Sequence, residues 1–181
     1  SWNRLPLICN ADADGYWQIQ VNTPEASFKS YSLIFDDGQK TEVKGVLCGE
    51  VWLASGQSNM EMPLRGFDNC PVQNSIQTIV SAGDQKGLRF FTVPKKQSYE
   101  PQTECESSWK LSSVENAPDF SAAAYYFGSS LSKVLNIPIG IIVSAYGGSR
   151  VESWMNRALL EKCPDIDLSK SAIEKVTEWT R

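Results

Sequence analysis

The fold of this chain is decided by residues 46–59, which read VLCGEVWLASGQSN. The first part, Val46–Ala54, is mostly apolar and does not alternate between apolar and polar residues. This pattern is typical of a parallel strand that is covered on both faces. A tight polar turn, Ser55–Asn59, follows it. Because such turns end the strands of α/β proteins, the stretch predicts an α/β sheet with a candidate site at the strand end.

Predicted strands and helices alternate after this stretch, which indicates a parallel α/β sheet. The short apolar runs 88–93 and 139–144 are bounded by glycine and proline and predict two further buried strands. Helical spacing of apolar residues and terminal signals predict helices, which we expect at 74–83, at 120–135, at 152–160 and, with Ile173, Val176 and Trp179, after Asp167. Residues 95–118 are expected to form a long irregular loop that contains Trp109.

Residues 1–45 are predicted to be antiparallel β structure. Apolar residues alternate with polar ones from Trp17 to Val21 and again from Tyr31 to Phe35. Asp37-Gly38 has the turn chemistry of a hairpin. Two or three such strands do not make a stable domain. We therefore assign 1–45 to the C-terminal portion of a β-sandwich and 46–181 to the N-terminal portion of an α/β domain, with Trp17 and Trp52 in the core.

The composition excludes several classes of protein. Hydrophobic residues make up 41% of the 181 residues, which is enough to bury a core. The formal net charge of −4 argues against a nucleic-acid surface and against docking on an anionic membrane. The chain contains no histidine, so it can form neither a Ser-His nor a Cys-His pair by itself.

The cysteines do not indicate a metal site. The five residues at 9, 48, 70, 105 and 163 contain no C-x-x-C pair, so we expect no metal. Cys70 and Cys105 both lie in loop-like sequence and are candidates for one disulfide. The alternative that we favour is free, buried thiols with at most that one bridge.

Two polar turns follow predicted strands and are candidates for the chemistry. They are Gly56–Asn59 and Gly147–Ser149. A serine such as Ser58 at the mouth of a helix presents its hydroxyl to solvent, and its backbone N–H can face a developing oxyanion. Glycine in a neighbouring turn lets the backbone approach a substrate closely. Met60 stands where a G-x-S-x-G elbow would have glycine, so spacing alone leaves Ser58 open as nucleophile or as turn serine.

The segment GEVWLASGQSNMEMPL, residues 49–64, resembles the nucleophile segment of the sialate O-acetylesterase family, serine carbohydrate esterases of the SGNH hydrolase superfamily. FSAAAYYFG at 120–128 and IPIGII at 137–142 resemble the same family, as does AYGGSRVESW at 145–154. The family usually has Trp-Gly-Gly-Thr where this chain has Tyr-Gly-Gly-Ser at 146–149. The likeness extends from about Gly15 to Met155.

The resemblance implies a fold and a reaction. The fold is a three-layer, flavodoxin-like SGNH-hydrolase parallel sheet, here incomplete and preceded by part of an antiparallel β-sandwich. Ser58 would attack an O-acetyl group of sialic acid or a related sugar and form an acetyl-enzyme that water hydrolyses. The oxyanion donors would be the N–H groups of Ser58 and of Gly148 or Gly147, with Gly148 placed first. No cofactor is implied.

The chain also departs from the family pattern. Neither the Gln-Gly-Glu type block nor the Asp-x-x-His block is present, and no histidine can substitute. A serine hydroxyl without an adjacent base is a weak nucleophile. We therefore expect this chain alone to be close to inactive and to be the middle piece of a longer enzyme. Its exposed sheet edge makes the C-terminal part of the same protein an expected partner, beside the O-acetylated sugar or glycan.

Five further residues are candidates for substrate binding. Gln57 and Asn59 flank Ser58 and either contact substrate or, as we favour, hold the turn through side-chain hydrogen bonds. Tyr146 and Trp154 form a sugar-stacking wall in one interpretation and pack against the protein in the other. Arg150 either steers the carboxylate of an acidic sugar or, as we favour, forms a surface ion pair.

The family pattern leaves the substrate open. An acetylesterase acting on xylan or another polysaccharide would fit it equally well. A different class of answer is a non-catalytic carbohydrate-binding module that kept the fold and lost its base. Members of the family that act on glycans are commonly secreted, periplasmic or, in eukaryotes, lysosomal, and we expect one of these locations.

Overall fold

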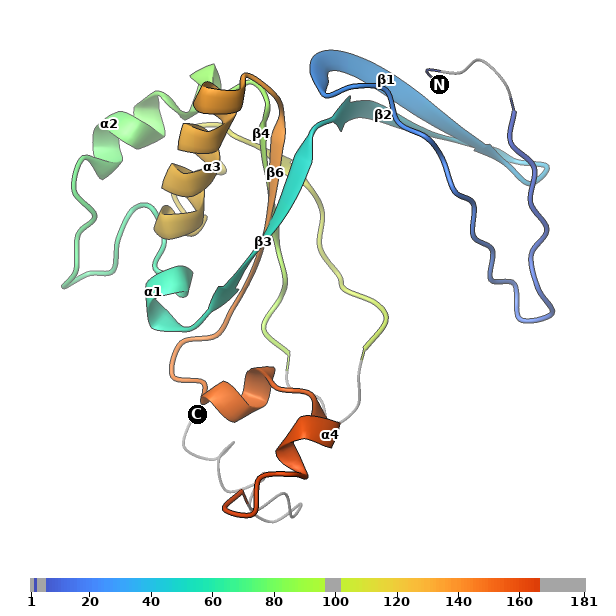
Figure 1. The fold of residues 1–181 in the computed structure, drawn as a ribbon. Coiled ribbons are helices and arrows are strands. Elements are labelled where there is room, and N and C mark those ends of the chain that lie inside the picture. Colours follow the sequence, from blue (N-terminus) through green and yellow to red (C-terminus); the bar gives the residue numbers. More distant parts are fainter. Residues whose placement is uncertain (1, 3–5, 97–101, 167–181) are drawn as a thin grey trace.

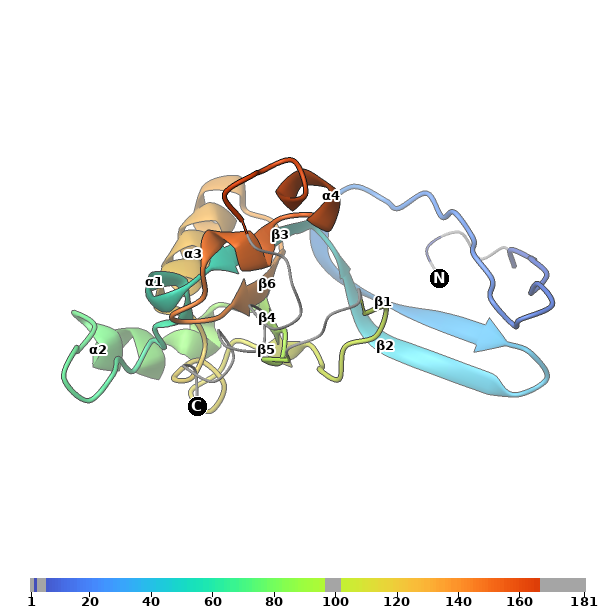
Figure 2. The ribbon, with the colours of Figure 1, turned by 90° about the horizontal axis from the view of Figure 1, so that it is seen from below.

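The computed structural model describes residues 2, 6–96 and 102–166. Two sheets make up its β structure, a two-stranded sheet and a four-stranded sheet with the strand order β3-β6-β4-β5. A long helix packs on the four-stranded sheet, and the two-stranded sheet projects away from it as a long hairpin (Figures 1 and 2). The fold is therefore a mixed α/β arrangement with one antiparallel and one largely parallel sheet, as the sequence predicted. The domain boundary at residues 45 and 46 stays a prediction.

The predicted hairpin is confirmed. Strand β1, Ser27–Asp36, pairs antiparallel with β2, Lys40–Cys48. The turn between them is held by the Asp36 carboxylate, which accepts a hydrogen bond from the N–H of Gly38 at 3.1 Å. Gly38 has a φ of +106°, a conformation that glycine adopts without strain.

The strand expected around residues 17–21 does not form. These residues have no regular structure, and Trp17 is 52% exposed, so its placement in the core was wrong. Its ring packs only at a tilt against Phe35, with 5.9 Å between centroids. Alternation of apolar residues makes a strand only where a second strand supplies hydrogen bonds, and none of the described strands lies along this segment.

The apolar stretch that opens the α/β region is divided at Gly49. Strand β2 ends at Cys48, and β3, Glu50–Gly56, begins in the other sheet. A Cβ atom at Gly49 would lie 2.1 Å from the carbonyl oxygen of Pro138, so only glycine fits at this close backbone contact. Strand β3 lies at the edge of its sheet and its residues are mainly exposed. The expectation of a strand covered on both faces was therefore wrong.

Strand β6, Ile139–Ala145, lies at the centre of the larger sheet and is parallel to both of its neighbours. These neighbours are β3 and β4, Leu88–Thr92. Both predicted strands are thus confirmed. A short antiparallel strand, β5, Lys110–Leu111, extends the sheet from within the segment that was expected to be irregular.

One long helix, α3, Ala122–Leu135, covers one face of this sheet (Figure 1). It begins where the side chain of Ser121 accepts a hydrogen bond from the N–H of Ala124, and it ends at Asn136 in the left-handed conformation. The core lies between this helix and the sheet. Its largest fully buried side chains are Leu64, Leu88, Ile139 and Ile141. The predicted helix near Asn74 is α2, Ser75–Val80, and the 3₁₀ turn η1, Ala82–Asp84, follows it.

The helix expected at 152–160 is two short pieces. They are a 3₁₀ turn η2, Val151–Trp154, and a helix α4, Arg157–Leu160. Between them Asn156 has extended backbone angles, and its side chain accepts a hydrogen bond from the N–H of Ala158 at 2.8 Å. Asn156 therefore begins a new helix instead of continuing the first one. The last predicted helix, with Ile173, Val176 and Trp179, lies outside the described residues.

The five cysteines are all free thiols, as in the alternative that we favoured, and the candidate bridge between Cys70 and Cys105 is not formed. Only Cys48 is buried, which differs from the expectation of buried thiols. Within the described ranges no helix is long and apolar enough to cross a membrane. The same residues contain no group of three or more potential metal-ligating side chains.

Candidate active site

The two candidate turns meet at the carboxyl ends of adjacent strands. Gly56 at the end of β3 is in register with Ala145 at the end of β6. Beyond this pair the N–H of Tyr146 donates a hydrogen bond to the carbonyl oxygen of Gly56 at 3.0 Å. The parallel pairing of β3 and β6 therefore places the turn that contains Ser58 beside the turn that contains Gly147.

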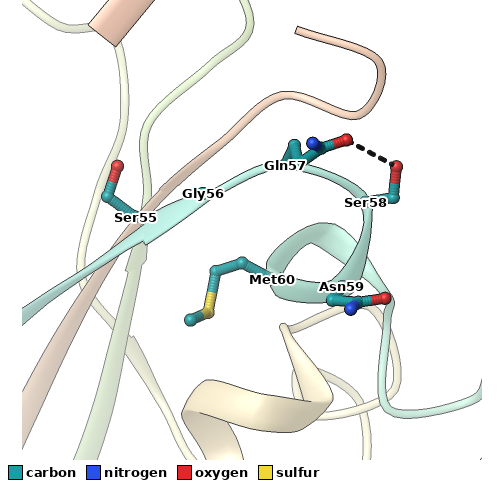
Figure 3. Close-up of a pocket in the computed structure, with 6 residues that line it drawn as sticks. All are labelled: Ser55, Gly56, Gln57, Ser58, Asn59 and Met60. Atoms are coloured by element: carbon teal, nitrogen blue, oxygen red, sulfur yellow. Dashed lines mark hydrogen bonds between the residues drawn. The ribbon is translucent and has the colours of Figure 1, made fainter. Parts of the chain in front are cut away.

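Ser58 begins a short helix, α1, Ser58–Glu61. Its hydroxyl is exposed and donates a hydrogen bond of 3.4 Å to the side-chain oxygen of Gln57, as Figure 3 shows. An open pocket of about 430 Å³ is lined by the six residues Ser55–Met60. The N–H of Ser58 lies in the first turn of a helix, where N–H groups have no partner within the helix. The hydroxyl and the N–H predicted to act together are thus at one open position.

The glycine turn lies close to the Ser58 hydroxyl. A Cβ atom placed on Gly147 would be 3.5 Å from Ser58 Oγ and 2.8 Å from Glu61 Oε2. Gly148 has a φ of +78°, and a Cβ atom there would meet no atom within 4 Å. Glycine at 147 therefore makes room for the Glu61 carboxylate, whereas glycine at 148 provides the left-handed turn.

Sequence reasoning missed Glu61, which is the best connected side chain of this site. Its Oε1 accepts a hydrogen bond from Lys95 Nζ, and its Oε2 accepts one from the N–H of Gly147. Partial burial acts to raise the pKa of Glu61, but the hydrogen bonds from Lys95 and Gly147 and the charge of Lys95 lower it below the ordinary value. The available signal was its position three residues after Ser58, which places the two on neighbouring parts of one helical turn.

Gln57 and Asn59 both line the pocket. Gln57 accepts the hydrogen bond from Ser58, in agreement with a role in holding the turn. Figure 3 shows Asn59 on the short helix with its amide directed away from Gln57. Met60 points back toward the protein, where it packs against the core and its sulfur accepts a hydrogen bond from Ser121 Oγ at 3.6 Å.

The aromatic candidates are tied to the glycine turn. Lys95 Nζ lies 5.3 Å from the centroid of the Tyr146 ring, within range of a cation–π interaction. Trp154 donates a hydrogen bond from Nε1 to Ser149 Oγ at 2.9 Å, and Ser149 Oγ donates in turn to the carbonyl oxygen of Tyr146. These contacts hold both side chains next to the turn. Their role in stacking against a sugar stays a prediction.

The predictions for Arg150 and Trp52 both differ from the structure. Arg150 is exposed, and within the described part of the chain it forms no ion pair, in contrast to the surface ion pair that we favoured. Trp52 is 42% exposed because it lies on the edge strand, where it packs edge-on against Phe127 at 5.2 Å. Its assignment to the core was therefore wrong.

A family model described as carbohydrate esterase, sialic acid-specific acetylesterase, matches residues 48–178. The chain is 33% identical over 129 residues to a sialate O-acetylesterase of Mus musculus and 30% identical over 129 residues to one of Homo sapiens. Each alignment covers 67% of this chain, but only 23% and 24% of the two relatives. The chain thus spans about a quarter of the length of the curated relatives it matches.

A solved structure agrees with these sequence comparisons. The crystal structure of a carbohydrate acetylesterase from Xanthomonas citri superimposes with a TM-score of 0.76 at 38% sequence identity. The match covers 84% of this chain and 34% of that one. Sequence and fold therefore lead to the same family.

Proposed function

Since this chain belongs to the family of sialic acid-specific acetylesterases among the carbohydrate esterases, we propose that it carries the nucleophile and part of the oxyanion site of a serine esterase. The substrate class is an O-acetylated sugar, either sialic acid or a related one. The observation that carries the proposal is the exposed Ser58 hydroxyl at a strand end, beside a glycine turn on the adjacent parallel strand.

The reaction proceeds in two balanced steps. Ser58 Oγ gives its proton to a base and bonds to the acetyl carbonyl carbon. The bond from that carbon to the sugar oxygen then breaks, and the sugar oxygen takes the proton from the base and leaves as a hydroxyl group. Water then attacks the acetyl-enzyme and releases acetate and the free Ser58 hydroxyl. In both steps negative charge develops on the carbonyl oxygen of the acetyl group. One correctly placed N–H donor is worth about 3 kcal/mol of transition-state stabilisation.

The chain does not contain the base for this reaction. It has no histidine, so the proton of Ser58 has no imidazole acceptor within these 181 residues. Enzymes that lose a member of the triad keep only the residual catalysis of the oxyanion site and of substrate binding. We therefore propose that the chain by itself is close to inactive. We further propose that the β3-β6-β4 arrangement is part of an SGNH-type three-layer sheet.

Chemical rescue by imidazole tests the nucleophile. The chain would be treated with p-nitrophenyl acetate with and without added imidazole, and acetylation would be located by mass spectrometry of peptides. General-base catalysis contributes roughly 10²–10⁴-fold when the base is positioned, so free imidazole should raise acetylation of Ser58 by about tenfold or more.

Two serine variants make this experiment specific. Ser58→Ala should lose the imidazole-dependent acetyl group, whereas Ser130→Ala, at an exposed serine of α3, should keep it. Acetylation that is spread over surface residues and is unchanged in Ser58→Ala would contradict the assignment of the nucleophile. Rapid ester hydrolysis without imidazole that Ser58→Ala abolishes would contradict the proposed inactivity.

A further inference from the structure

The ends of all three parallel strands meet at the carboxylate of Glu61. Glu61 itself is the last residue of α1, which directly follows β3. Lys95 follows β4, whose pairing with β6 is extended by a hydrogen bond from Val93 N–H to the carbonyl oxygen of Val143 at 2.8 Å. Gly147 follows β6. Lys95 and Gly147 each donate to a different oxygen of Glu61, so one side chain connects three segments that are far apart in sequence.

This arrangement determines which N–H groups are available beside Ser58. The N–H of Gly147 already donates to Glu61 and so cannot donate to an oxyanion at the same time. Within the described residues the N–H of Gly148 donates no hydrogen bond to a backbone or side-chain acceptor, so it is available to an oxyanion. A negative carboxylate near a developing oxyanion would oppose catalysis, but Lys95 neutralises its charge.

The contacts also argue against Glu61 as the missing base. Both of its oxygens accept hydrogen bonds, and its pKa lies below the ordinary value, which makes it a poor proton acceptor. The partly exposed ion pair with Lys95 is better suited to holding a backbone segment in place.

We propose that Glu61 is a positioning residue: its carboxylate ties the glycine turn to the nucleophile helix, Lys95 balances its charge, and Gly148 with Ser58 supplies the oxyanion N–H groups. The part of this inference that concerns the oxyanion rests on the proposed function. The tie itself is a property of the fold, and it can be tested separately.

The tie is tested by following backbone amides of the 181-residue chain by NMR as the pH is lowered. The Gly147 amide should shift with the protonation of Glu61, at a midpoint below the ordinary glutamate pKa of about 4.3. A carboxylate whose pKa is lower in the folded state contributes stability at pH values above the pKa that it has in the unfolded chain. This contribution, with the hydrogen bond from Gly147, is lost as the pH falls through the folded pKa. Lys95→Met should move the midpoint upward, because Lys95 is the charged group that contacts Glu61 among the described residues.

Gly38 is a matched control within the same spectra. Its N–H also donates to a carboxylate, that of Asp36, in the hairpin. Glu61→Ala should abolish the pH response of the Gly147 amide and leave the Gly38 amide unaffected, and unchanged amide shifts of buried residues such as Ile141 show that the variant is folded. A Gly147 amide that does not respond to pH, or that responds equally in Glu61→Ala, would overturn the tie.

The functional part is tested by imidazole-dependent acetylation of Ser58 in Glu61 variants. Glu61→Ala should reduce the rate by about tenfold, the size of effect expected when a catalytic group is misplaced by a fraction of an ångström. Glu61→Gln should recover part of the rate, because its amide oxygen still accepts from Gly147. A base at this position would instead lose as much in Glu61→Gln as in Glu61→Ala.

The two proposals fail in different ways. If Ser58 of the unaltered chain is not acetylated while the Gly147 amide titrates as described, the esterase proposal fails and the tie stands. If Ser58 is acetylated and Glu61→Ala leaves that rate unchanged, Glu61 is not a positioning residue, whatever the state of the Gly147 amide.

Discussion

The two faces of the four-stranded sheet contain similarly apolar residues, yet the face under α3 is much more buried than the other. On the face under α3, Phe90 is 2% exposed and Ile141 is 0% exposed. On the opposite face, Val51 is 62% exposed and Leu53 is 68% exposed. Successive residues of a strand point to opposite faces, so both environments occur within single strands. The burial of a residue is therefore decided by the layer that packs on its face and by its distance from the sheet edge, where Trp52 of β3 is 42% exposed although it shares the face of Ile141.

The second face is covered in part by Trp109. Its ring packs on Phe91 with centroids 5.5 Å apart, and it lies 3.1 Å from the position of a Cβ atom on Gly140. Arg89 belongs to the same set of alternating residues on β4. Its Nε is buried and has no hydrogen-bond partner within the described part of the chain, and burial lowers the pKa of Arg89. This face therefore contains a buried polar atom that lacks a hydrogen-bond partner, whereas none of the described residues under α3 has one.

The largest effect is expected in the buried layer. Phe90 stacks on Phe120 with ring centroids 4.2 Å apart and also contacts Tyr125. Replacing Phe90 with alanine should lower the free energy of unfolding by about 3–5 kcal/mol, the usual cost of truncating a buried phenylalanine. Urea unfolding followed by fluorescence measures this change. A loss below about 1 kcal/mol would mean that the layer under α3 is much looser than the structure indicates.

A smaller effect is expected where the covering helix begins. Ser121 is buried and caps α3 through the hydrogen bond from the Ala124 N–H. Ser121→Ala should lower the free energy of unfolding by about 1 kcal/mol, as for other N-cap residues. Ser130→Ala on the exposed side of the same helix serves as its matched control and should not destabilise the chain. Equal effects of the two variants would contradict the capping role.

The smallest effect is expected on the exposed face. Leu53→Ala should change the free energy of unfolding by less than about 0.5 kcal/mol, because the side chain loses little solvent-accessible area on folding. The same urea titration measures it alongside Phe90→Ala. A cost of more than about 2 kcal/mol would show that Leu53 is covered in solution and would remove the contrast between the two faces.

Local patterns were sufficient where neighbouring residues determine the structure. The hairpin was predictable because Asp37-Gly38 supplies its own turn chemistry, and α3 was predictable from the spacing of apolar residues. The pattern at 17–21 misled because a strand needs a partner that its own residues do not specify. At 152–160 the helical spacing predicted one continuous helix, but the side chain of Asn156 caps a new helix within this segment.

The sequence by itself determined the family, the nucleophile candidate and the glycine turn, because each of them can be recognised from a run of consecutive residues. Tertiary structure alone decided what lies next to these motifs. Glu61 stands in the nucleophile motif, yet its partners Lys95 and Gly147 are brought to it only by the order β3-β6-β4 of the parallel strands. A hydrogen bond depends on the separation of two atoms in space, and that separation is set by how the strands pair and not by their distance along the chain.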